Sequence, residues 1–271
     1  MAKSAEMPFL DHLEELRTRL MWALGALMIG VAVGFAVVLR FNVVRLLERP
    51  ILPYLQGNLI VTHPTDAFKI VMMVSFAFGL IIALPVILYQ LWAFLSPALY
   101  QHEKKVVVPV LLAAAVLFLA GIAIAWFLVL PYTLKFLLTF QASAFDSFIR
   151  AEEYFSFATT ISLAFGAVFE LPIAIMLLTA LGFITPKFLH TYRKHAAVLC
   201  IVVAAFITPG GDPMSLAAFS VPLYLLFEFS VVLSEVVFRR RKRREAARAR
   251  REALEAEEQE RERERVGDAP A

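Results

Sequence analysis

The chain has 271 residues, of which 60% are hydrophobic and 18% charged, and its formal net charge is +3. With a mean hydropathy of +0.73 it is more apolar than soluble domains of this length, which indicates a membrane protein. The tail from Arg239 onward holds 12 of the 26 Lys and Arg, so the basic excess is local and gives no indication of nucleic-acid binding.

The first apolar segment follows a short amphipathic stretch at the N-terminus. Residues 9–20 place apolar side chains at positions 9, 13, 16 and 20, which is the spacing of a helical stripe. The uncharged segment 20–39 would rise about 30 Å as a helix, enough to cross the hydrocarbon core. We therefore expect an interfacial helix that leads into a first membrane span.

Five more apolar segments follow. The six predicted spans cover residues 20–39, 70–100, 106–134, 154–185, 196–208 and 214–238. The fifth offers only about 20 Å of helix, and the turn formers Pro209 to Pro213 separate it from the sixth. The sequence predicts an all-α, curved, bowl-like bundle of six transmembrane helices forming one domain, residues 1–238.

The distribution of Lys and Arg predicts the orientation. An even number of spans puts both termini on one side, and the basic block 239–244 directly after the last span favours the cytoplasm for that side. We expect a multi-pass protein of the cytoplasmic membrane, N-in and C-in. Residues 239–271 would be a charged cytoplasmic tail, helical or disordered.

Two acidic residues in cytoplasmic segments are candidates for binding. Glu15 lies on the polar face of the N-terminal helix. Its presence there has a purely structural explanation, in which Glu15 pairs with Arg19 and Glu14 pairs with Arg17. Glu103 lies between the second and third spans, where a charge solvated in a loop is the simpler structural explanation. Together, two carboxylates on one face suit two guanidinium groups, because the planar fork donates paired hydrogen bonds. A metal site from His12 and Glu15 has too few ligands, so we expect neither metal nor cofactor.

Glu170 stands near the centre of the fourth span. A carboxylate at mid-membrane costs about 2.5–3.5 kcal/mol on insertion scales, so intramembrane acids are usually functional. One explanation is a protonated acid hydrogen-bonded within the bundle, but we favour docking of a polar group from a partner helix. Pro172 beside it and Pro85 in the second span predict helix kinks.

Four motifs of this chain resemble one known family. They read FLDHLEELRTRL at 9–20, LPVILYQLWAFLSPALYQHEKK at 84–105, FGAVFELPI at 165–173 and ITPGGDP at 207–213. In order and spacing they are similar to the TatC subunit of the twin-arginine protein translocase, over about residues 8–238. The tail from Arg239 lies outside this resemblance.

The resemblance implies a receptor, not an enzyme, that binds twin-arginine signal peptides and recruits TatA-like and TatB-like single-span partners to export folded proteins with the proton-motive force. It also implies self-association within a complex in the lipid bilayer. Glu170 matches the intramembrane acid that meets the partners, and Pro85 matches a kink. The positions that match the signal-binding area are Glu15, Arg17, Glu103, Phe94, Leu99 and Tyr100.

Two other classes of protein compete with this interpretation. An ion-coupled secondary transporter is the main alternative, since six kinked spans with a central acid would suit it, but no inverted repeat is visible. A membrane enzyme is a poorer alternative because the sequence shows no nucleophile with a base, no phosphate loop and no metal-ligand cluster.

Overall fold

The structure, a computed structural model, describes residues 7–55, 58–95, 107–139, 148–208 and 213–267. The described part is helical, and its one β-type contact is an isolated bridge between Ile60 and Arg150. The elements in chain order are α1 (Met7–Arg40), α2 (Val43–Leu47), the 3₁₀ helix η1 (Leu52–Tyr54), α3 (Asp66–Leu95), α4 (Val107–Ile124), the π-helical turn η4 (Ala125–Val129), α5 (Leu130–Thr139), α6 (Ala151–Val168), α7 (Leu171–Leu181), α8 (Pro186–Thr191), α9 (Arg193–Ile207) and α10 (Pro213–Gly267).

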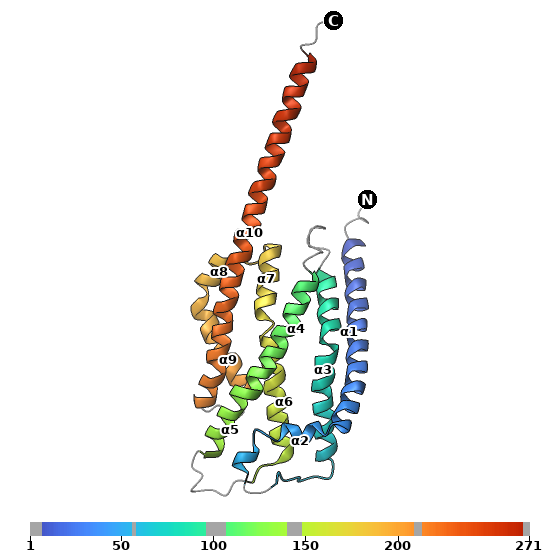
Figure 1. The fold of residues 1–271 in the computed structure, drawn as a ribbon, viewed down its shortest axis with the longest axis vertical. Helices are drawn as coiled ribbons and strands as arrows, with labels where there is room; N and C mark the ends of the chain where they lie inside the picture. Colours follow the sequence, from blue (N-terminus) through green and yellow to red (C-terminus); the bar gives the residue numbers. More distant parts are fainter. Residues whose placement is uncertain (1–6, 56–57, 96–106, 140–147, 209–212, 268–271) are drawn as a thin grey trace.

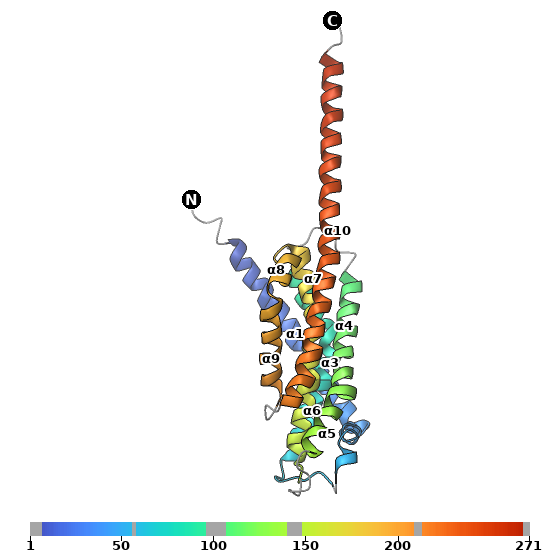
Figure 2. The same cartoon turned by 90° about the vertical axis from the view of Figure 1, so that its left-hand side faces the viewer.

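The helices form a bundle with α1 and α3 at one edge and α8, α9 and α10 at the other (Figure 1). Both termini lie at the same end of the bundle, and α10 continues far beyond it (Figures 1 and 2). The other end is covered by the segment that contains α2 and η1. The bundle therefore has a termini end and a covered end, and these two names are kept below.

Among the residues that the structure describes, five helical segments are long and apolar enough to cross a membrane. They are 13–40, 66–94, 108–139, 151–180 and 215–243, and each overlaps one of the six predicted spans. The remaining segment, predicted at 196–208, forms α9, whose 15 residues fall short of a full crossing. In Figure 1, α9 ends before it reaches the level at which α6 begins. The all-α class is confirmed, whereas the count of six spans stays a proposal.

The outward surface of the helices is apolar along the bundle. Met28 on α1 is 72% exposed and Phe206 on α9 is 88% exposed, and many other large apolar side chains share this property. Soluble proteins rarely expose such continuous apolar surface, whereas lipid tails would cover it. The exposure pattern therefore agrees with the membrane class that composition predicts.

Closely packed glycines hold α1 against α3. A Cβ atom on Gly79 of α3 would come within 2.5 Å of the Cα of Val31 and within 2.8 Å of the carbonyl carbon of Gly30, both in α1. The two backbones approach this closely only because Gly30 and Gly79 carry no side chain. This contact fixes the α1–α3 pair that carries the first site described below.

Two helices predicted as continuous spans are interrupted. The chain from α4 to α5 passes through the π-helical turn η4 just before Pro131, whose missing N–H cannot complete an α-helical ladder there. The fourth predicted span divides into α6 and α7 at Phe169 and Glu170, with Pro172 in the first turn of α7. α3, in contrast, stays helical through Pro85.

α10 is one helix of 55 residues that contains both the last span and most of the predicted tail. At the termini end it is fixed to α7, because Nη1 of Arg241 donates a hydrogen bond of 3.2 Å to the carbonyl of Ala180. Gly182, with a φ of 88°, ends α7 there, and a Cβ on it would lie 2.5 Å from the Arg241 guanidinium. Glycine is needed both for the left-handed backbone and for this approach.

Candidate functional site

A cavity of about 440 Å³ lies between α1 and α3 near the termini end. Arg19 stands between the two helices, since it donates to the Glu15 carboxylate on α1 at 3.2 Å and to Oε1 of Gln90 on α3 at 3.3 Å. Both charged side chains are about one-third exposed, so the pair is only partly screened by water. The residues lining the cavity are Glu14, Glu15, Thr18, Arg19, Trp22 and Gln90.

The local helix explains this geometry. Glu15 and Arg19 are four residues apart on α1, which puts them one turn apart on one face. The expected Glu15–Arg19 pair is confirmed, and within the described residues no ion pair joins Glu14 to Arg17. The apolar stripe Leu13, Leu16 and Leu20 is 42–55% exposed, so it faces outward from the bundle.

Of the residues predicted to bind a signal, the structure places three. Glu15 lines the cavity, Arg17 is exposed on the same helix, and Phe94 is half-buried in the last turn of α3. Leu99, Tyr100 and Glu103 lie outside the described residues. The helices that flank them, α3 and α4, end and begin at the termini end, where α1 also begins (Figure 1).

Glu170 lies at the junction of α6 and α7. Its backbone N–H bonds to the carbonyl of Ala167 at 3.2 Å, and its own carbonyl accepts from Ala174 at 2.9 Å. Its side chain caps no helix, and its buried Oε1 atom receives no hydrogen bond from the described part of the chain. A buried, unsatisfied carboxylate oxygen is costly, so this atom is suited to accept from a group outside the chain.

Glu228 on α10 makes an instructive contrast to Glu170. Its carboxylate accepts from the hydroxyl of Tyr224 at 2.8 Å and pairs with Arg193 at the start of α9, also at 2.8 Å. Glu228 is therefore satisfied within the chain. Glu170, in contrast, keeps a buried oxygen that accepts no hydrogen bond from the described residues.

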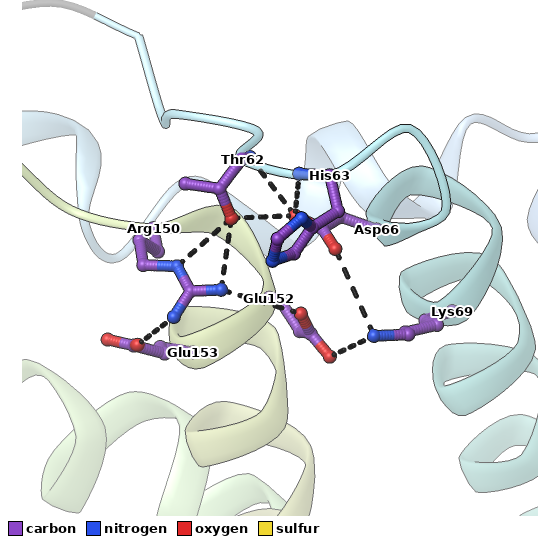
Figure 3. A network of polar contacts seen from close by, with 7 residues as sticks. All are labelled: Thr62, His63, Asp66, Lys69, Arg150, Glu152 and Glu153. Carbon is purple, nitrogen blue, oxygen red and sulfur yellow. Dashed lines mark hydrogen bonds and ion pairs between the residues drawn. The ribbon is translucent and has the colours of Figure 1, made fainter.

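A polar network at the covered end joins the segment before α3 to the start of α6 (Figure 3). The buried Asp66 accepts from the backbone N–H of Thr62 and of His63 at 3.1 and 2.9 Å, and from the Thr62 hydroxyl. Arg150 donates to the same hydroxyl, and Lys69 pairs with Glu152 at 3.1 Å. Backbone hydrogen bonds of 2.9 Å on both sides of Ile60 complete the connection.

Sequence reasoning missed this network and the role of Gln90. Gln90 is an uncharged polar residue within the apolar stretch before Phe94, and that isolation was the available signal. For the network, the run Thr62 to Asp66 is a helix-start pattern in which an acidic side chain caps preceding backbone groups. Its connection to α6 spans more than 80 residues and has no signal in the sequence.

The fold and its long apolar helices define a polytopic, all-helical membrane protein. Within the described residues, no three His, Cys, Asp or Glu side chains are grouped to hold a metal ion. The family model for "Sec-independent protein translocase protein (TatC)" matches residues 11–222. The chain belongs to this family, whose members are protein translocase components.

Individual relatives are similar in sequence to this chain along most of its length. The TatC protein of Aquifex aeolicus is 39% identical over 244 residues, covering 89% of this chain and all of the relative. TatCy of Bacillus subtilis is 34% identical and covers 90% of this chain and 95% of its own length. A crystal structure of the "Twin Arginine Translocase Receptor- TatC" superimposes with a TM-score of 0.75 at 39% identity, covering 83% of this chain and 99% of that one. These findings confirm the predicted family and do not favour an ion-coupled transporter.

Proposed function

We propose that this protein is the receptor and core subunit of a twin-arginine translocase. It binds twin-arginine signal peptides, recruits single-span partners similar to TatA and TatB, and exports folded proteins with the proton-motive force. It lies in the cytoplasmic membrane with six spans and both termini in the cytoplasm, and copies associate within the complex. The name of the solved relative, a twin-arginine translocase receptor, supports this role.

One observation carries the proposal: the cavity between α1 and α3 already holds a guanidinium. Arg19 reaches a carboxylate and an amide oxygen there, at 3.2 and 3.3 Å. An arginine of a signal peptide presents the same planar donor set, so it can join or replace Arg19 at Glu15. Trp22, which is 65% exposed, offers an aromatic surface on which a guanidinium can stack.

The second arginine of the signal would bind Glu103. This carboxylate belongs to the connection between α3 and α4, and both helices have their ends at the termini end near the start of α1. Phe94, Leu99 and Tyr100 would contact the apolar part of the signal, and Arg17 would add charge selectivity. The exposed apolar stripe of α1 gives that apolar part a continuous path into the membrane.

The orientation is supported by charge. Both termini lie at one end of the bundle, and the basic block 239–244 follows the last apolar stretch at that same end. Cytoplasmic loops of membrane proteins carry an excess of Lys and Arg. We therefore put the termini end, and the cavity with it, in the cytoplasm.

A peptide-binding experiment tests the signal site. Glu15→Gln and Glu103→Gln are each expected to weaken binding of an Arg-Arg signal peptide about three- to tenfold, because a partly exposed pair is worth up to about 1 kcal/mol and bidentate geometry adds to it. Replacing Arg-Arg by Lys-Lys in the peptide should weaken binding to the wild type by a similar factor. Fluorescence anisotropy of a labelled peptide with the purified full chain in nanodiscs measures each dissociation constant.

Glu153→Gln is the matched control, because it removes a carboxylate that is 66% exposed at the covered end. It should leave both peptides unaffected. Equal affinity of both peptides for the wild type and for the Glu15 and Glu103 variants would refute the proposed site.

We further propose that Glu170 docks a polar side chain of a single-span partner within the membrane. Its support is the buried Oε1 atom, which receives no hydrogen bond from the described chain and lies at the junction between α6 and α7. An interhelical hydrogen bond from a partner would satisfy this oxygen and remove the cost of burying it.

A further inference from the structure

A second cavity lies at the termini end, between α8 and α10, and the proposed function does not use it. Its volume is about 770 Å³, which is larger than that of the cavity at Glu15. α8 and α10 lie side by side where α10 leaves the bundle (Figures 1 and 2). The described lining of this cavity comes from both helices. α8 and the residue before it contribute Thr185, Pro186, Lys187 and His190, and α10 contributes Glu235, Phe238, Arg239, Lys242, Arg243 and Ala246.

The lining of this cavity is strongly basic. Four cationic side chains face one carboxylate, and that carboxylate is already engaged, since Glu235 pairs with His190 at 2.7 Å and with Arg239 at 3.4 Å. The cavity therefore keeps an excess of positive charge without a counter-ion from the described chain. The four cations are Lys187, Arg239, Lys242 and Arg243.

The cavity also continues into an apolar stripe. Val232 and Val236 lie on the same face of α10 as Arg239 and Arg243, because the steps between these residues are three and four positions. Val232 is 58% exposed and Val236 is 44% exposed, so the surface changes from apolar to basic along one line of the helix. This change lies in the last turns of the segment 215–243, which is long and apolar enough to cross a membrane.

We infer that this cavity binds the phosphate headgroup of an anionic phospholipid from the leaflet at the termini end. The basic lining accepts the phosphate, and the valine stripe below it contacts the acyl chains. A free phosphate ion would use the cations alone, whereas an anionic lipid matches both the charge and the adjoining apolar surface. The bound lipid would link α8 to α10 at the point where the long helix leaves the membrane.

Lipid binding by the purified full chain tests this inference without any signal peptide or partner. The chain is titrated in neutral detergent with dioleoylphosphatidylglycerol or with dioleoylphosphatidylcholine, and bound lipid is counted by native mass spectrometry. The anionic lipid should bind at least about tenfold more tightly than the zwitterionic one, as expected for several basic residues near a lipid phosphate. Inorganic phosphate at the same concentration should not displace it.

The double variant Lys187→Gln with Arg243→Gln removes two cations of the cavity, neither of which takes part in an ion pair among the described residues. It should weaken binding of the anionic lipid about tenfold or more. The matched control, Lys194→Gln with Arg240→Gln, removes the same two residue types from the same end outside the cavity lining and should change binding less than about twofold.

Three results would overturn the inference: equal affinity for the two lipids, equal losses in the two double variants, or displacement of the lipid by inorganic phosphate. The last would identify an anion site rather than a lipid site. Because no peptide is present, these results are independent of the outcome at Glu15 and Glu103.

Discussion

At the scale of single residues, Glu170 and Glu228, two acids within apolar stretches, differ in their partners. Glu228 is held by Tyr224 and Arg193, both at 2.8 Å, so its charge is compensated inside the chain. Glu170 has a buried oxygen that no described residue satisfies. Both residues are glutamates in apolar stretches. Only their neighbours therefore determine which carboxylate is paired within the chain and which remains available to a partner.

The first residue-scale prediction concerns Glu170. Glu170→Ala should weaken association with the single-span partner about three- to thirtyfold, since an interhelical polar contact in a membrane is worth about 0.6–2 kcal/mol. Glu170→Gln, which keeps an acceptor oxygen, should retain part of the affinity. Co-purification with the partner from membranes, quantified against wild type, measures the loss.

Two controls accompany the Glu170 experiment. Binding of the Arg-Arg peptide should be unchanged in Glu170→Ala, because the two sites lie on different helices. A photo-crosslinker at position 170 should capture the partner, whereas one at Met28, which is 72% exposed on α1, should not. Capture from position 28 but not from 170 would contradict the docking proposal.

At the scale of elements, contact between helices depends on small residues more than on apolar ones. Lipid tails are as apolar as leucine, so burying leucine between helices gains little, whereas close backbone approach gains packing. Gly30 and Gly79 provide such an approach between α1 and α3. The pair then carries Glu15 and Gln90 at the distances that let Arg19 reach both.

Gly79→Ala should separate α1 from α3. The new Cβ would meet backbone atoms of α1 at 2.5–2.8 Å, which no side-chain rotation relieves, so we expect destabilisation of about 1–3 kcal/mol. The thermal unfolding temperature in detergent should fall, and peptide binding at the α1–α3 cavity should weaken with it.

Gly25→Ala is the matched control within α1. Apart from the neighbouring backbone of α1 itself, no atom lies within 4 Å of a Cβ at Gly25, so the substitution should be neutral or stabilise the helix by up to about 1 kcal/mol. Similar unfolding temperatures for the two variants would show that close approach at Gly79 does not hold the pair together.

At the scale of the whole molecule, the two ends of the bundle are built differently. The covered end is braced by the network around Asp66 and Arg150, which connects segments more than 80 residues apart (Figure 3). The termini end carries the two cavities and the long extension of α10. This interhelical polar network thus lies opposite the end at which we propose that ligands bind.

Asp66→Ala should loosen the segment before α3. Its carboxylate accepts two backbone hydrogen bonds and one from a hydroxyl, and bonds to a charged acceptor are the stronger kind. Amide hydrogen exchange at Thr62 and His63 should accelerate at least about tenfold. Glu153→Gln, at the exposed edge of the same network, should change exchange at these amides little. Unchanged exchange in Asp66→Ala would show that the backbone bridge alone holds the segment.

The sequence by itself determined the class, the approximate spans and the family. Lipid forces backbone hydrogen bonds to close within each helix, so long apolar runs such as 20–39 have one available structure, and local pattern suffices to predict it. The motif strings around Glu15 and Glu170 likewise identified the family before any contact was known.

Only the tertiary structure decided how those helices use their polar groups. That Arg19 bridges Glu15 to Gln90, that Glu228 is satisfied while Glu170 is not, and that Arg150 reaches Thr62 all depend on which faces pack together. These contacts join residues from 35 to 88 positions apart, and their energies depend on distance and burial, which local sequence does not encode. The basic cavity between α8 and α10 appears for the same reason: Lys187 of α8 joins the three cations of α10, Arg239, Lys242 and Arg243, only when the two helices pack.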